Sequence, residues 1–297
     1  MLDMIARFAN GRGFWPAIPA VAFLAVLMVI PLVLLLSFGF SDIVVSRGVI
    51  VSQDFTLDHL TKILGDRLYL LTFQRSIGLS LSVTALCLIF GFPVAYLYLR
   101  SGTFARRAIL IAVIAPLLTS GIVRTYAWIV ILGGQRGIVN RALLDLGLID
   151  APLRILNTHW AVLIGMTQVH LPLMILPLIA VMTRHDKALD EASANLGASR
   201  LQTLRHVILP MSVPGIGTGA TLVFTLSYTT FVVPQLLGGG NYLNAATMAF
   251  EQMVYSLEWS KGAVTSTLLL VTCIFFIGLF TWASQAATRW IRQEGVA

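Results

Sequence analysis

Six long apolar runs with no internal acidic residue constrain this chain more than any other feature. A helix needs about 20 mostly apolar residues to cross the hydrocarbon core of a bilayer. The runs cover residues 18–40, 73–99, 108–132, 160–182, 214–237 and 263–284. Alternating strands of about ten residues, typical of a membrane barrel, are not visible. The sequence therefore predicts an all-α polytopic membrane protein with six transmembrane helices.

Composition supports this fold class. Only 11% of the residues are charged and the mean hydropathy is +0.86, whereas soluble domains carry about 25% charged residues. The first run is too long for a signal peptide and no small-x-small cleavage site follows it, so we expect it to be retained. The expected organisation is an N-terminal segment at 1–17, a six-helix domain at 18–284 and a tail at 285–297.

The basic residues predict the orientation. Six spans place both termini on one side, and the segments on that side hold 11 of the 20 lysines and arginines, against seven on the other side. Lys and Arg accumulate in cytoplasmic loops. Both termini are therefore predicted to be cytoplasmic. The formal charge of +7 follows from this bias and needs no nucleic-acid partner.

The longest cytoplasmic loop, residues 183–213, is predicted to be folded. Its first part is rich in helix formers and ends at Gly197, a typical helix C-cap. Its second part begins with a capping Ser199 and ends at Pro210. Leu189, Ala192 and Leu196 share one face of the first helix. This stripe either docks on a soluble partner or packs against the protein's own helix ends.

Enzyme chemistry has little support in the sequence. There is no GxxxxGK[ST] loop, no HExxH and no GxSxG, and a proton pump or metal transporter would normally carry acids inside its spans. The glycine cluster at 215–219 follows prolines rather than a strand, so we interpret it as a close-packing surface. Cys87 and Cys273 lie inside apolar runs and indicate no redox function. We expect no cofactor or metal in this chain.

Some residues in the runs are candidates for a substrate path. Arg124 lies two-thirds along the third run, where an arginine should face protein or water, although snorkelling would also explain it. His170 is either a pore residue beside Pro172 and Pro177 or a hydrogen-bonded core histidine. The aromatic candidates for a cation-binding wall are Tyr126, Trp128, Phe224, Tyr228 and Phe231. Membrane helices are rich in aromatic residues in any case, and Tyr126, Tyr228 and Phe231 are the ones assigned to the possible path. Two acids near the periplasmic mouth, Glu251 and Glu258, could attract cations.

The cytoplasmic loop resembles a known motif. Glu191-Ala192-Ser193, three residues, Gly197, nine residues and Val207-Ile208-Leu209-Pro210 resemble the EAA motif of permease subunits in bacterial ABC importers. Ser193 and Val207 replace the alanine and isoleucine of the pattern. The resemblance implies a type I importer in which this loop docks on the ATPase. The residues assigned to coupling are Asp190, Glu191, Ala192, Ser193, Leu196, Gly197, Arg200, Leu209 and Pro210.

The resemblance extends to most of the chain. Segments 123–128, 147–153 and 234–239 look like the spermidine/putrescine branch, on the side of its first permease subunit. The resemblance implies two ATPase subunits that hold ATP and Mg, a second permease that is a different chain, a periplasmic binding protein and the lipid of the bacterial inner membrane. No nucleic-acid partner is implied.

The function that these features predict is a permease subunit for a small polar solute, with polyamine first. An opine, aminoethylphosphonate or another small zwitterion or anion is the alternative within the same transporter class. The alternative from another class is a membrane scaffold or membrane enzyme. A scaffold has no reason to combine the motif spacing with six spans.

Overall fold

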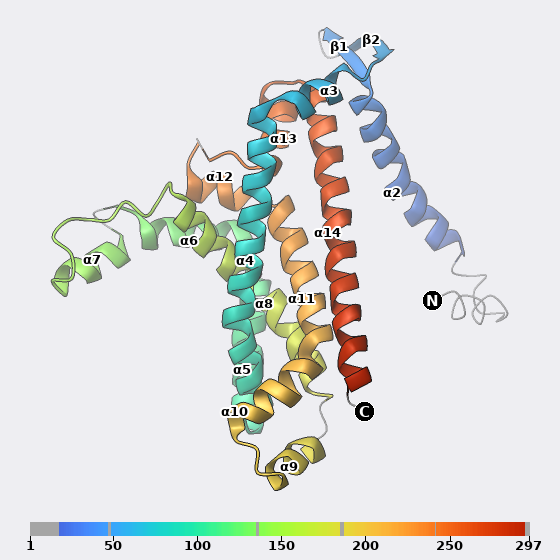
Figure 1. Ribbon diagram of the computed structural model, residues 1–297. Helices are drawn as coiled ribbons and strands as arrows, with labels where there is room; N and C mark the ends of the chain where they lie inside the picture. Colours follow the sequence, from blue (N-terminus) through green and yellow to red (C-terminus); the bar gives the residue numbers. More distant parts are fainter. Residues whose placement is uncertain (1–17, 47–48, 135–136, 185–186, 241, 295–297) are drawn as a thin grey trace.

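A computed structural model describes residues 18–46, 49–134, 137–184, 187–240 and 242–294. In this part of the chain, helices run lengthwise along a bundle and a small β-hairpin lies at one end (Figure 1). Five helices are long and apolar enough to cross a membrane, and a bent pair supplies a sixth segment. The predicted helical class is confirmed, and the hairpin is an addition that hydropathy did not indicate.

The chain begins with α2 (Ile18–Gly39), the hairpin strands β1 (Ser41–Ser46) and β2 (Val49–Phe55), and α3 (Asp58–Gly65). The strands are antiparallel, with a register shift between Val44 and Val45. The spans that follow are α4 (Arg67–Arg100), α8 (His159–Met182), α11 (Leu209–Thr229) and α14 (Trp259–Glu294). Asp66 caps α4, because its carboxylate accepts the Leu68 N–H at 2.8 Å.

Helix α8 is the centre of the bundle. It packs most extensively on α4 and α11, and 61% of its most apolar 18-residue window is buried, against none of the window in α2. Close packing depends on glycines of α11. A Cβ at Gly215 would lie 3.1 Å from the Pro177 carbonyl, and one at Gly219 would lie 2.6 Å from Met174 Sδ. The expected packing role of the glycine cluster is confirmed.

The third span is not one straight helix, contrary to the sequence-based expectation. It consists of α5 (Thr103–Ile114) with a 3-10 turn at Ala115–Leu118, followed by α6 (Gly121–Leu132), with a bend of 100° between them. At the bend, Thr119 adopts extended backbone and Ser120 has non-helical backbone, with a φ of −57° and a ψ of 132°. Helix α6 and the short α7 (Ile138–Asp145) therefore extend to one side of the bundle (Figure 1).

The fifth apolar run is also divided. Helix α11 ends at Thr229, Thr230 is extended, and α12 (Val232–Gly238) follows. The long fifth helix instead begins on the cytoplasmic side, because α10 (Arg200–Thr203) and a π-helix, η3 (Leu204–Ile208), continue into α11 as one apolar segment, Arg200–Thr229. The predicted separate helix ending at Pro210 is therefore wrong, and the span predicted at 214–237 is displaced.

The remaining elements lie at the two ends. Helix α9 (Lys187–Asn195) lies with α10 at the end away from the hairpin. The hairpin, α3 and α13 (Ala245–Phe250) lie at the opposite end, where α13 continues into a π-helix, η4 (Glu251–Tyr255) (Figure 1). Helix α2 begins, and α14 ends, toward the side that carries α9. We refer to this side as the coupling end and to the other as the hairpin end.

Candidate coupling segment and translocation path

The turn between α9 and α10 has the geometry of a helix C-cap. Gly197 adopts a φ of +80°, a conformation that costs other residues free energy. The Ala198 N–H donates to the Ser193 carbonyl at 3.0 Å, which is the long bond of a Schellman motif. A Cβ at Gly197 would meet nothing within 4 Å. The backbone conformation, rather than a lack of space, therefore favours glycine here.

Two hydrogen-bonded contacts fix the second half of the segment. Ser199 and Gln202 form a reciprocal capping box, in which the Ser199 N–H donates to Gln202 Oε1 at 2.7 Å. The hydroxyl oxygens of Ser193 and Thr203 lie 2.9 Å apart. Ser193, which replaces the alanine of the motif, thus links α9 to α10 across the turn.

A π-helix connects this segment to the membrane. The Leu209 N–H donates to the Leu204 carbonyl, five residues back rather than four. Pro210 follows at once; it has no N–H, and its ring would clash with the His206 carbonyl in a regular α-helix. The wider turn of η3 relieves that clash and lets the helix continue. The Leu-Pro pair of the motif therefore lies at a continuous joint, not at a helix end.

The apolar stripe of α9 is open to solvent. Leu196 is 89% exposed and Leu189 is 43% exposed, and Ala192 is also exposed. Packing on the protein's own helix ends, one of the two expected alternatives, is therefore wrong for these residues. Arg200 is exposed and Leu209 is 41% exposed. The side chains of Asp190 and Glu191 lie outside the described part of the chain, although both positions belong to α9.

The path candidates from the sequence do not form one cluster. Arg124 lies in the first turn of α6, directly after the bend, and interacts electrostatically with His170 of α8. His170 is 4% exposed and its Nδ1 lies 2.8 Å from the Met166 carbonyl, to which it donates as the protonated nitrogen. Nε and one terminal nitrogen of Arg124 are buried without a hydrogen-bond acceptor. Tyr126, two residues further along α6, is 55% exposed.

Two of the aromatic candidates, Tyr228 and Phe231, pack on other aromatic residues of the protein. Tyr228 is 1% exposed and packs in a cluster with Phe224, which it stacks on at 5.5 Å. Phe231 lies at the break after α11 and stacks on Phe250 of α13 at 4.6 Å between ring centroids. Tyr228 therefore has no open face for a solute in this conformation, while Phe231 is only partly buried.

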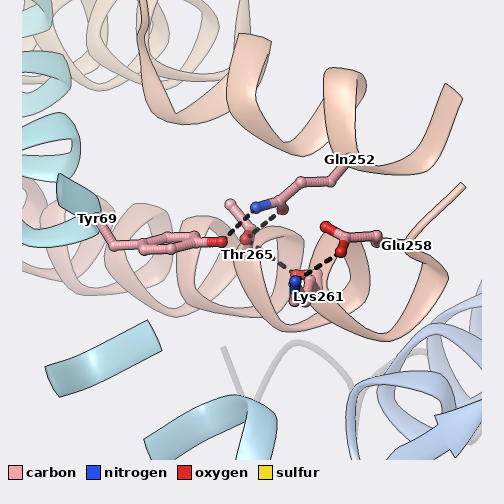
Figure 2. Close-up of polar contacts among 5 residues, drawn as sticks. All are labelled: Tyr69, Gln252, Glu258, Lys261 and Thr265. Carbon is pink, nitrogen blue, oxygen red and sulfur yellow. Dashed lines mark hydrogen bonds and ion pairs between the residues drawn. The ribbon is translucent and has the colours of Figure 1, made fainter. Parts of the chain in front are cut away.

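A polar network joins three elements at the hairpin end (Figure 2). Gln252 of η4 donates to the Tyr69 hydroxyl of α4 at 2.7 Å and accepts from the Thr265 hydroxyl of α14 at 2.8 Å. Beside it, Lys261 Nζ lies 2.6 Å from a Glu258 carboxylate oxygen. The charge of Glu258 is therefore compensated, which weakens its expected role in attracting cations. Glu251 makes no hydrogen bond or ion pair through its side chain among the described residues.

Tyr69, Gln252, Thr203 and Thr265 were not singled out from the sequence. Tyr69, Gln252 and Thr265 are uncharged polar residues without a motif around them, and Thr203 is one of the nine unspecified residues between Gly197 and Val207 in the motif. Partners 183 residues apart, such as Tyr69 and Gln252, leave no local pattern. A lone glutamine in the loop region before the last apolar run was the one available signal.

A second contact at the hairpin end involves Tyr242, in the loop before α13. Its hydroxyl lies 2.8 Å from His159 Nδ1, at the start of α8. Burial raises the pKa of Tyr242 to about 12, against a smaller opposing influence of the Arg75 charge. The hydroxyl therefore stays protonated at neutral pH and ties this loop to α8.

In the part of the chain that the structure describes, His, Cys, Asp and Glu residues form no group of three or more that could hold a metal ion. The two cysteines are buried and not bonded to each other. What the geometry offers is an exposed apolar stripe on α9, followed by a helix that continues into the apolar bundle.

Comparisons with known proteins agree with this arrangement. Residues 87–289 match the family described as "Binding-protein-dependent transport system inner membrane component". The chain is 34% identical over 244 residues to the spermidine/putrescine transport system permease protein PotB of Escherichia coli (strain K12), covering 82% of this chain and 88% of that one. It is 26% identical over 157 residues to a putative 2-aminoethylphosphonate transport system permease protein, PhnU, of Salmonella paratyphi A, covering 52% and 53%.

A solved structure shares the fold. It is a bacterial ABC transporter involved in the import of the acidic polysaccharide alginate, with a TM-score of 0.71 and 17% identity, covering 92% of this chain and 94% of that one. The chain belongs to the family of inner membrane components of binding-protein-dependent transport systems. It is a permease subunit of an importer in the inner membrane, as the sequence predicts.

Proposed function

We propose that this chain is one of two membrane-spanning subunits of an ATP-driven importer for polyamines such as putrescine and spermidine. The observation that carries the substrate class is the 34% identity to PotB over 82% of the chain. The coupling segment, with its exposed stripe and its continuous helix into the bundle, supports the ATP-driven mode of transport.

The proposed assembly contains partners that supply what this chain lacks. Two ATPase subunits would bind ATP and Mg and dock on α9 through Glu191 and the stripe of Leu189, Ala192 and Leu196. A second permease, encoded as a different chain, would form the other half of the path, and a periplasmic binding protein would deliver the substrate at the hairpin end. Both termini would then be cytoplasmic, in agreement with the distribution of basic residues.

The mechanism follows from the continuity of the fifth helix. When the ATPase subunits close, they would move α9, and the Ser193–Thr203 contact would pass the movement to α10. Because α10, η3 and α11 form one helix, the displacement would reach Thr229, where the helix breaks beside Phe231. A bundle with two packed arrangements converts such a displacement into a switch from outward-facing to inward-facing access.

Substrate recognition is expected to lie mainly outside this subunit. The apolar runs contain no carboxylate to hold a dication, Glu258 is paired with Lys261, and Tyr228 is buried. Low affinity along the path would favour release into the cytoplasm. Phe231 and Tyr126 keep surface through which they could contact an amine by a cation–π interaction, and Glu251 keeps a carboxylate near the mouth.

A second candidate is a small zwitterion or anion, such as an opine or an aminoethylphosphonate. Arg124 favours it, because two of its nitrogens are buried without acceptors and an unpaired buried charge is costly. An anionic group that passed the bend would compensate that charge after a small movement of α6. The similarity to PhnU also favours this second candidate.

Uptake by the reconstituted complex tests both candidates. Labelled putrescine or spermidine is offered with the binding protein and ATP, in competition with opines, aminoethylphosphonate and amino acids. Uptake displaced only by polyamines supports the first proposal. Uptake that polyamines do not inhibit, but that an anion or a zwitterion blocks, supports the second candidate. In that case Arg124→Gln is the next variant to test. Absence of any ATP-dependent uptake would contradict both.

A further inference from the structure

A cavity of about 230 Å³ lies at the coupling end, where α4 and α8 end and α11 begins. It is lined by Leu99 at the end of α4, Met182 at the end of α8, Ile208 of η3, and Met211 and Pro214 of α11. Its surface is mostly apolar. It is much larger than the roughly 30 Å³ that one water molecule takes up in the liquid.

Apolar cavities of this kind do not hold ordered water well, because water needs two to four polar partners. The cavity lies where the apolar runs end, since Leu99 and Met182 are the last residues of their runs. It is therefore beside the cytoplasmic boundary of the hydrocarbon core. An acyl chain is the apolar material that is abundant at this depth.

The lining also includes one cation. Arg184 follows α8 by two residues, and its side chain is exposed. It forms no ion pair with an acid among the described residues. Basic residues at the cytoplasmic end of membrane helices attract anionic headgroups. An apolar cavity with an arginine beside it at the membrane surface is complementary to an anionic lipid.

We infer that this cavity is a site for an anionic phospholipid, with part of an acyl chain against Met182, Ile208 and Met211 and the phosphate at Arg184. The site lies between the two helices that enter and leave the coupling segment. A lipid bound there would contact both α8 and η3 and stabilise their packing. This would make the coupling movement depend on lipid composition, whichever solute is carried.

Lipid retention tests the site without reference to transport. The full-length protein is purified in mild detergent with its natural partners, mixed with phosphatidylglycerol or phosphatidylcholine, and the bound lipid is measured by native mass spectrometry. The wild-type protein should retain more phosphatidylglycerol than phosphatidylcholine. Arg184→Gln should lower that retention about fivefold, the size expected for one arginine near a headgroup. Met211→Trp, which fills the cavity, should abolish retention of both lipids at this site.

The matched control is Arg107→Gln. Arg107 is an exposed arginine of α5 at the same membrane surface and does not line the cavity, so its replacement should leave retention unchanged. Equal loss in Arg107→Gln and Arg184→Gln would show general surface attraction and overturn the site. Unchanged retention in Met211→Trp would overturn it as well.

A second readout uses inorganic phosphate as competitor. If millimolar phosphate displaces nothing, the acyl chain contributes to binding, as the cavity requires. If phosphate alone displaces the lipid fully, binding is to the arginine only, and the cavity is not the site. Because retention is measured without substrate, a failure of the polyamine proposal would leave this result unaffected.

Discussion

The coupling end and the hairpin end each contain a π-helix, but they use it differently. At the coupling end, η3 continues into α11 and the neighbouring Leu196 is 89% exposed. At the hairpin end, η4 is followed by a reversal in which Leu257 adopts a φ of +55°, and Gln252 is only 8% exposed. At the first end the stripe of α9 is left uncovered by this chain, whereas at the second end the buried Gln252 is bonded within the chain. Leu257 beside η4 is also exposed, at 63%.

The difference between the two ends indicates which part of the chain depends on partner proteins. The stripe of Leu189, Ala192 and Leu196 is exposed in the free chain, and an apolar stripe along one helix face is a surface that suits a partner. A buried glutamine that bonds to two helices stabilises the chain itself, since unpaired polar groups are costly inside a protein. We therefore expect changes at the coupling end to affect transport, and changes at the hairpin end to affect stability.

The largest effect is expected for Gly197→Ala. A side chain at a φ of +80° costs about 1–2 kcal/mol, and this strain would distort the angle between α9 and α10. Uptake should fall about tenfold while the amount of protein in the membrane is unchanged. ATP-dependent uptake and a membrane immunoblot measure the two quantities. Gly102→Ala is the control, since Gly102 has a φ of −75° and open space around it. Normal uptake by Gly197→Ala would remove the coupling role from this turn.

Gln252→Leu should lower the stability of the protein and leave its docking on the ATPase intact, the reverse of what we expect for Gly197→Ala. It leaves the half-buried Tyr69 hydroxyl without its donor and removes one of the two acceptors of the Thr265 hydroxyl, which keeps the Lys261 carbonyl. The loss of these two hydrogen bonds costs about 1–3 kcal/mol in all. The unfolding temperature of the purified protein should fall, while ATPase docking is retained. Gln74→Leu, at an exposed position of α4, should leave both unchanged. An unaltered unfolding temperature for Gln252→Leu would contradict the view that the hairpin end serves stability while the coupling end serves transport.

Ser193→Ala and Thr203→Val sharpen the account of the coupling end. If their hydroxyl contact transmits movement, the two changes should be non-additive in uptake, with a coupling energy of about 0.5–1.5 kcal/mol. A double-mutant cycle of uptake rates measures this energy. Additive effects would mean that the contact carries no part of the movement, and that α9 acts through the backbone of the turn alone.

Lys261→Met should have the smallest effect. The Glu258–Lys261 pair is 2.6 Å long, but its side chains are 45% and 38% exposed, and exposed ion pairs contribute about 0–1 kcal/mol. The unfolding temperature should hardly change, in contrast to Gln252→Leu next to it. The released Glu258 carboxylate should, however, raise the sensitivity of cation uptake to salt. A large loss of stability would show that the pair belongs to the buried network.

The amino-acid sequence determined the class of this protein. Six apolar runs, the bias of basic residues and the spacing from Glu191 to Pro210 are local properties, and they predict a permease with a folded coupling loop. The glycines of α11 could also be interpreted locally, since small residues permit close helix packing.

The tertiary structure decided which apolar runs remain straight. Helix α8 is continuous although it contains Pro172 and Pro177, because neighbouring helices surround it. The breaks instead fall at Thr119–Ser120, after the 3-10 turn that contains Pro116, and at Thr230–Phe231, just before the short α12 that contains Pro234. Hydropathy averages over about 20 residues and carries no direction, so it cannot locate a bend of 100°. The burial of Tyr228 and the bonds of Gln252 depend on helices far apart in the chain, and only their packing could bring these groups together.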